Sequence, residues 1–273
     1  MCPTELVCGV PQGSVFGPYL FTLYAAPIED ILIKHRIDFM PYADDTQLYI
    51  TCKSGQVDTA KLETCVEDIR EWMLSNKLVL NDSKTEIIHF HSKFRATNVL
   101  SSIKVGESEV HTCETVRDLG FYFDCNATMS SHVSQTCRSA SFALHRIGKI
   151  RNILDQTTTE RLVHAFITSR IDFCNSLLYK NSETMKSGKL QLLQNSAARL
   201  VTRTKINEHI TPVLQQLHWL PVEKRVEFKL LVLTYKTMNG QAPLYLQLLL
   251  SKVSPVRVTR RSEELRLFEP KYN

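Results

Sequence analysis

The chain has 273 residues, of which 43% are hydrophobic and 22% are charged, as expected for a globular protein of one or two domains. It contains no apolar run long enough for a transmembrane helix, and its N-terminus lacks the pattern of a signal peptide, so we expect an intracellular protein, nuclear or cytoplasmic, with no membrane partner. Residues 1–135 carry 11 Lys and Arg against 18 Asp and Glu, residues 136–205 carry 12 against 4, and residues 206–273 carry 10 against 6. This asymmetry is typical of a protein that binds metal ions with one half and a polyanion with the other, although solvated basic helices are the alternative.

The eight cysteines are scattered along the chain without a C-x-x-C pair. Zinc sites usually contain closely spaced ligand pairs, and disulfide scaffolds are usually short and secreted. We therefore expect reduced, mostly buried thiols and no zinc site.

The first predicted elements flank a turn that contains glycine and serine. The pattern predicts a strand over residues 5–10 and a helix over residues 15–34, joined by a turn of Pro11, Gln12, Gly13 and Ser14. Gly13 permits a positive φ and Ser14 is a good N-cap, so backbone N–H groups at this helix start could bind a phosphate. A turn with no binding role is the alternative.

Residues 39–50 have the sequence FMPYADDTQLYI, in which two apolar flanks surround adjacent carboxylates. Aromatic and branched residues favour strands, so the pattern predicts a β-hairpin with Asp44 and Asp45 at its tip. Two unpaired carboxylates so close together repel each other, and a divalent cation relieves this repulsion. A solvated turn is the alternative.

The remaining pattern is mixed up to about residue 128 and helical after it. We expect an amphipathic helix over residues 57–76, strands over 78–80, 85–90, 103–105, 109–111 and 116–124, and helices over 134–151, 157–169, 189–203 and from Pro221 to Gly240. Residues 253–273 are expected to be poorly ordered. The basic side chains that we expect to follow the phosphates of a nucleic acid are Arg138, Arg146, Lys149, Arg151, Arg161, Lys186, Lys189, Arg199, Arg203 and Lys205.

Three segments in this order resemble the reverse transcriptases of LINE-type (non-long-terminal-repeat) retrotransposons: residues 9–18 (GVPQGSVFGP), residues 42–45 (YADD) and residues 78–86 (LVLNDSKTE). The resemblance implies that Asp44 and Asp45 are catalytic metal ligands. It also implies nucleotide or template contacts for Pro11, Gln12, Gly13, Ser14, Tyr42 and Ala43, and a position for Lys84 near the phosphates of the nucleotide. Residues 116–124 resemble the family's primer grip, with Leu119 and Gly120 at its turn.

The resemblance implies an α+β fold: a partial polymerase palm of antiparallel sheet and packing helices over residues 1–128, an all-α thumb-like and C-terminal region over 129–252, and a disordered basic tail over 253–273. The implied reaction is nucleotidyl transfer from a dNTP to a primer 3′-hydroxyl, directed by an RNA template. It would use two Mg²⁺ ions, with Mn²⁺ as a substitute. The implied partners are an RNA template, a DNA primer or target, and dNTP.

One family feature is missing from the expected order. In these polymerases a third aspartate lies on a strand upstream of the Pro-Gln-Gly motif, whereas the eight residues before Gly9 contain no aspartate, and Asp30 and Asp38 follow the motif. We therefore expect a polymerase fragment that is inactive or nearly so on its own. The alternative function is a non-catalytic remnant that binds nucleic acid through its basic helices; a relic with no selected role is the third possibility.

Overall fold

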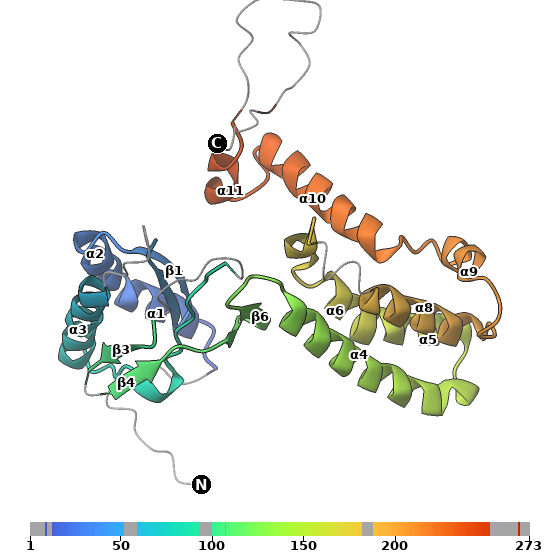
Figure 1. The fold of residues 1–273 in the computed structure, drawn as a ribbon, viewed down its shortest axis with the longest axis horizontal. Helices are drawn as coiled ribbons and strands as arrows, with labels where there is room; N and C mark the ends of the chain where they lie inside the picture. The colour runs from blue at the N-terminus through green and yellow to red at the C-terminus, as the bar shows by residue number, and fades with distance from the viewer. Residues whose placement is uncertain are drawn as a thin grey trace, which may run out of the picture. The chain divides into compact units, whose positions relative to one another are not determined.

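The computed structural model describes residue 9 and residues 13–51, 59–92, 100–106, 108–181, 188–251 and 267 (Figure 1). The strand expected over residues 5–10, the side chains of Pro11 and Gln12, and all of the expected tail except Leu267 lie outside these residues. The chain divides into two compact units. Unit 1 comprises residues 1–117 and 124–127, and unit 2 comprises residues 118–123 and 128–273. No helix among the described residues is long and apolar enough to span a membrane.

Unit 1 mixes helices with short antiparallel strand pairs. Its elements are α1 (Gly17–Ala25), α2 (Pro27–Lys34), β1 (Asp38–Tyr42), β2 (Asp45–Tyr49), α3 (Thr59–Ser75), the short 3-10 helix η1 (Asp82–Lys84), β3 (Ser102–Val105) and β4 (Ser108–His111). Strand β1 pairs with β2, and β3 pairs with β4. The predicted mixture of helices and antiparallel strands is confirmed, but the described strands form separate two-stranded sheets rather than one sheet.

The helix predicted over residues 15–34 is two helices, α1 and α2, which are separated at Ala26. Pro27 has no N–H to donate, and its ring clashes with the carbonyl group four residues earlier, so a regular helix cannot pass through it. Ser14 is not the N-cap of α1, because the helix begins at Gly17 and Phe16 occupies the cap position without a side-chain cap. The Ser14 Oγ nevertheless accepts a hydrogen bond from the Gly17 N–H at 2.9 Å, at the first residue of the helix.

The core of unit 1 lies between α2, α3 and one face of the β1–β2 hairpin. Its buried residues are Ile28, Leu32, Ile37, Cys65 and Ile69. Phe39 and Leu48 from the hairpin pack against this cluster, as does Trp72 from α3. The amphipathic helix predicted over residues 57–76 is therefore confirmed from Thr59 onward, and its apolar stripe has the predicted role.

The strands predicted over residues 78–80 and 85–90 are wrong. The N–H of Leu78 donates to the Met73 carbonyl at 2.8 Å, after Lys77 has entered the left-handed region, so the chain here closes the C-terminal end of α3. Residues 85–90 form only one isolated bridge, between Ile87 and Thr112. An apolar pattern identifies a segment that can be buried, but a strand also needs a backbone partner, which the pattern does not specify.

A third hairpin consists of β5 (Thr115–Asp118) and β6 (Phe121–Asp124), and the chain passes from unit 1 to unit 2 within it. Unit 2 is helical beyond this point. Its elements are α4 (Ser130–Ile150), η2 (Arg151–Ile153), α5 (Gln156–Val163), the π-helical turn η3 (His164–Thr168), α6 (Ser169–Asp172), η4 (Asn175–Leu178), α8 (Lys189–Thr202), α9 (Ile210–Gln216), α10 (Val222–Met238) and α11 (Leu244–Leu248). The helices predicted over residues 134–151, 189–203 and from Pro221 to Gly240 appear with shifted ends. The helix predicted over residues 157–169 is divided into α5, η3 and α6, and the sequence patterns missed α9 and α11.

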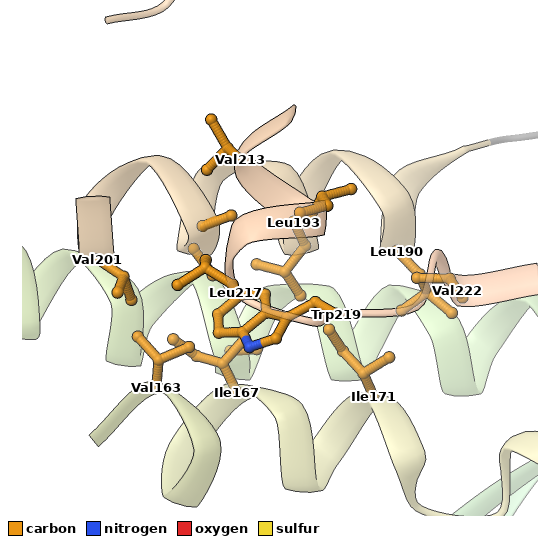
Figure 2. Close-up of a cluster of buried hydrophobic side chains, with 14 of the residues drawn as sticks. Val163, Ile167, Ile171, Leu190, Leu193, Val201, Val213, Leu217, Trp219 and Val222 are labelled. Atoms are coloured by element: carbon orange, nitrogen blue, oxygen red, sulfur yellow. The ribbon is translucent and has the colours of Figure 1, made fainter. Parts of the chain in front are cut away.

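The core of unit 2 forms where α4, α5 and α8 pack against one another (Figure 1). Trp219, which is 7% exposed, lies in this core among side chains that include Ile167 and Leu217 (Figure 2). It comes from the His218–Pro221 stretch, which precedes α10. Trp219 therefore anchors the connection between α9 and α10.

Polar contacts fix the start of α10 against α8. The Gln191 Oε1 accepts a hydrogen bond from the Val222 N–H at 2.8 Å, and the buried Gln194 donates to the Leu220 carbonyl at 2.8 Å. Arg225, in the first turns of α10, donates through two nitrogens to both carboxylate oxygens of Asp172. The two glutamine contacts satisfy backbone groups at a helix start, and the Arg225–Asp172 pair ties α10 to α6, so the His218–Pro221 stretch has a structural role here.

Candidate functional site

The tip of the β1–β2 hairpin places two acidic residues next to each other. Tyr42 pairs with Asp45, so Ala43 and Asp44 form the turn between the strands. Ala43 has φ = 55°, in the left-handed region that residues with a Cβ rarely adopt. Backbone strain of this kind persists only where the surrounding structure holds it, and it occurs often at functional sites. The predicted hairpin with its acidic tip is confirmed.

The two faces of this hairpin have different environments. Side chains alternate between the faces of a strand, and residues paired across two strands share a face. Phe39 and its partner Leu48 lie on the face that packs on the core, whereas Tyr42 and its partner Asp45 lie on the other face. Tyr42 is 62% exposed. Burial of one face therefore fixes the register and leaves the face that carries Asp45 open.

Asp44 and Asp45 are both exposed, and neither forms a salt bridge with any residue in the described part of the chain. Carboxylate oxygens are the ligands that Mg²⁺ prefers, and this ion keeps several positions for water and substrate phosphate. The donor chemistry of the tip therefore suits Mg²⁺. However, no group of three or more His, Cys, Asp or Glu side chains among the described residues is arranged to hold a metal ion. The described residues thus supply a pair of candidate ligands.

The turn before α1 has the backbone conformation expected from its sequence. Gly13 has φ = 86°, which a glycine adopts without strain, and the neighbouring Ser14 accepts the hydrogen bond from Gly17 described above. Pro11 and Gln12 are outside the described residues, so their predicted nucleotide contacts stay predictions.

Lys84 lies on η1, and its side chain is exposed. The turn is held by Arg70 of α3, whose Nη2 donates to Asp82 Oδ1 at 2.5 Å. Gly106 makes room for this contact, because a Cβ at that position would lie 2.6 Å from the Arg70 guanidinium carbon. The sequence patterns did not identify Arg70, since its partners are 12 and 36 positions away along the chain. We interpret Arg70 as the residue that orients the Lys84 turn.

The turn between β5 and β6 also has left-handed backbone conformations. Leu119 has φ = 44° and Gly120 has φ = 89°. Two central residues with positive φ are the signature of the type I′ turn, whose twist matches that of the two strands. The predicted hairpin is confirmed, and its turn lies in unit 2, whereas the Asp44–Asp45 tip lies in unit 1.

Helix α4 presents a basic face. Its 21 residues contain no Asp or Glu, and its buried side chains, which include Val133 and Ala140, lie on one side. Arg138, Arg146 and Lys149 are exposed on the opposite side. Phe142, which is 65% exposed, lies on this face with the Arg146 guanidinium 5.9 Å from the centre of its ring. Cations with an exposed aromatic ring among them suit binding to a nucleic acid.

Other basic residues in the predicted set have structural roles instead. Arg151 is buried and donates hydrogen bonds to the carbonyl groups of Leu154, Leu200 and Val201. Arg199 donates to the carbonyl groups of residues 205 and 208, and Arg203 donates to the carbonyl of Arg151. The prediction that Arg151 follows phosphates is therefore wrong, because its guanidinium satisfies the last carbonyls of α8. Lys186 is outside the described residues.

Comparison with known families identifies the first part of the chain. Residues 3–123 match the family model of reverse transcriptase (RNA-dependent DNA polymerase). Over this range the chain is similar to reverse transcriptases. The matched range includes the Asp44–Asp45 tip, the Gly13–Ser14 turn, Lys84 and the β5–β6 turn. The resemblance to reverse transcriptases is thereby confirmed for residues 3–123.

The reverse transcriptase region and the helices that follow it are similar to several transposon proteins. The probable RNA-directed DNA polymerase from transposon BS of Drosophila melanogaster is 23% identical over 82% of this chain and 25% of its own length. The Pol polyprotein from type-1 retrotransposable element R1 of Nasonia vitripennis is 21% identical over 79% of this chain and 66% of its own length. The RNA-directed DNA polymerase from mobile element jockey of Drosophila melanogaster is 25% identical over 47% of this chain and 14% of its own length.

The chain thus spans about a quarter of the length of the BS polymerase. Because the similarity to BS covers more of the chain than residues 3–123 contain, it extends into the helices of unit 2. No solved structure matches the chain.

Proposed function

We propose that this chain is part of a retrotransposon RNA-directed DNA polymerase, in which unit 1 contributes to the palm and unit 2 to the thumb. The observation that carries the proposal is the pair of exposed carboxylates at the strained tip of a hairpin whose back is buried, within a region that matches the reverse transcriptase family. Mutual repulsion makes such a pair attractive to a divalent cation. In this proposal Asp44 and Asp45 are the metal ligands that this chain supplies.

The metal, Mg²⁺ with Mn²⁺ as a substitute, would stabilise negative charge on the phosphates and on the attacking primer oxygen. The residues of the chain have separate roles around it. Tyr42 lies on the same hairpin face as Asp45 and would border the primer end, with Ala43 shaping the turn. The Gly13–Ser14 turn would offer backbone N–H groups to the nucleotide, and Lys84 would approach its phosphates.

The exposed basic face of α4 supports a proposed role in binding the template–primer duplex. Each phosphate that a protein neutralises on duplex DNA releases counterions. A plot of log binding constant against log salt concentration therefore becomes steeper by about 0.9 for each phosphate contacted. We expect Arg138→Gln and Arg146→Gln each to reduce this slope by roughly one unit. Lys77→Gln, an exposed change in unit 1, is the matched control. Unchanged slopes for both α4 variants would contradict this role.

The metal-binding part is tested by titrating the full chain with Mn²⁺ and following the signal of the free ion by electron paramagnetic resonance. We expect Asp44→Asn and Asp45→Asn each to lower the affinity by about tenfold, because each removes one of few protein ligands. Asp38→Asn is the control, since Asp38 is an exposed carboxylate at the other end of the same hairpin. Equal Mn²⁺ binding by all three variants would refute the assignment.

A non-catalytic nucleic-acid-binding remnant is the second candidate function, and the basic face of α4 favours it equally. The distinguishing experiment measures duplex binding and primer extension on the same preparation with Mg²⁺. If the chain is a non-catalytic remnant, its duplex binding should depend steeply on salt concentration and should be unchanged by Asp44→Asn. We expect little or no extension by the isolated chain, and robust extension that depends on Asp44 would refute that expectation.

A further inference from the structure

The Leu119–Gly120 turn is held in place by aromatic side chains of unit 2. Phe121, the first residue of β6, is 3% exposed and stacks on the ring of His132 from α4, with ring centres 4.0 Å apart and planes 20° apart. The His132 ring also meets the ring of Phe173 at a centre-to-centre distance of 6.3 Å. These three rings form what we name the aromatic clamp: Phe121, His132 and Phe173.

The aromatic clamp contacts the Leu119–Gly120 turn as well as strand β6. A Cβ on Gly120 would lie 3.7 Å from two ring carbons of Phe173, which is ordinary van der Waals contact. The ring of Phe173 therefore lies beside Gly120, while Leu119 remains 43% exposed. The His132 ring neighbours both phenyl rings, with ring centres 4.0 Å from Phe121 and 6.3 Å from Phe173. Removal of the His132 ring would leave Phe121 and Phe173 without their shared neighbour.

The contacts of His132 indicate that its ring face matters more than its ring nitrogens. The ring is 5% exposed, and the hydrogen bond between its Nε2 and Thr136 Oγ1 is 3.5 Å long, at the outer limit for such a bond. Burial lowers the pKa of His132, and a hydrogen bond to the Phe173 backbone opposes this to a smaller extent, so the ring is neutral near pH 7. A neutral imidazole stacks as an aromatic ring does.

We propose that His132 is a positioning residue that fixes the Leu119–Gly120 turn through its stack on Phe121, and thereby sets where the turn meets the primer end. For its effect on the primer, this inference rests on the proposed function together with the primer-grip role that the resemblance implies for Leu119 and Gly120, whereas the effect on the turn is independent of both. A positioning residue of this kind can be replaced by another flat ring but not by a small side chain.

The test compares His132→Ala with His132→Phe, with His145→Ala as the control because His145 is an exposed histidine on the same helix. The first measurement is the amide resonance of Gly120 in protein labelled with ¹⁵N-glycine, identified by its disappearance in Gly120→Asn. We expect a shifted or broadened Gly120 resonance in His132→Ala. His132→Phe and His145→Ala are expected to keep the wild-type position.

The second measurement is the preference of the chain for a duplex with a recessed primer 3′ end over a blunt duplex of the same length. Removal of one aromatic stack corresponds to roughly a three- to tenfold change in an equilibrium constant, so we expect His132→Ala to lose that much of the preference. His132→Phe is expected to restore it. Binding to the blunt duplex, which the α4 face would carry, is expected to stay unchanged.

The outcomes separate the two levels of the inference. An unmoved Gly120 resonance in His132→Ala, or a His132→Phe variant that behaves like His132→Ala, would overturn the positioning role. If the wild-type chain shows no preference for the recessed end, the primer function proposed for the turn fails, and the Gly120 resonance alone decides the positioning role. If His132→Ala does not fold, Phe173→Leu takes its place, because Phe173 is 43% exposed and its substitution removes the ring beside Gly120.

Discussion

Arg151→Met tests whether a cation in the basic half of the chain has a structural role. The substitution keeps an apolar stem and removes three donors that now bond to the carbonyl groups of Leu154, Leu200 and Val201 at 2.7 to 2.8 Å. A buried acceptor that loses its partner costs about 1–3 kcal/mol. Three such losses at a helix end, where water can reach part of the site, sum to about 3–6 kcal/mol. That is a large share of the roughly 5–15 kcal/mol typical of a folded domain.

The assay is urea unfolding followed by tryptophan fluorescence. The chain has two tryptophans, Trp72 in unit 1 and Trp219 in the core of unit 2. In a Trp72→Phe background the fluorescence therefore comes from Trp219 and reports the unfolding of unit 2. Arg146→Met, an exposed change on α4, is the control and is expected to unfold within about 0.5 kcal/mol of the parent. A variant of Arg151 that unfolds like its parent but binds duplex more weakly would refute the structural role and restore a phosphate contact.

Two further predictions concern unit 1. Gly106→Ala forces the Arg70 guanidinium away from its partner, so we expect it to destabilise unit 1 by about 1 kcal/mol more than Gly13→Ala, which shares the positive φ but has no atom within 4 Å of the added Cβ. Urea unfolding reported by the tryptophan of unit 1 measures the difference, and equal destabilisation by the two variants would contradict the proposed role of Gly106. Hydrogen bonds from His35, and then from Lys34, lower the pKa of Asp68 below its usual 3.8. The resulting stabilisation is present above about pH 4 and is lost as the pH falls through the lowered pKa. Asp68→Asn should therefore reduce the dependence of the free energy of unfolding on pH in this range. If the free energy of unfolding of the variant varies with pH as that of the parent does, Asp68 makes no such contribution.

Local patterns in the sequence predicted much of the fold. The hairpin tip at Asp44 and Asp45 follows from two apolar flanks around a polar turn. The turn at Leu119 and Gly120 was implied by the resemblance to the primer grip, since the local pattern predicted strand across residues 116–124. The helix that begins after Pro221 was predicted from a proline at its start and Gly240 beyond its end, and it spans Val222–Met238. Each of these features depends on residues within a few positions of one another.

The missed features depend on partners far apart along the chain. Arg70 is identified as the support of the Lys84 turn only through Asp82 and Gly106. The clamp joins Phe121 and Phe173, which are 52 positions apart. The break at Pro27 is different, because its signal is local: a proline within a helical pattern already predicts the end of α1. Strands over residues 78–80 and 85–90 were wrongly predicted because an apolar pattern does not show whether a pairing partner exists.

The basic half of the chain illustrates why net charge overstates a nucleic-acid interface. Arg151, Arg199 and Arg203 direct their guanidinium groups to backbone carbonyls, which makes them poor candidates for phosphate contacts. The exposed cations of α4 form a smaller set on one face that has no carboxylates. The salt dependence of binding should therefore follow this set and not the total charge of residues 136–205. Cations that complete the fold and cations that remain open to a ligand can be separated only once their hydrogen-bond partners are known.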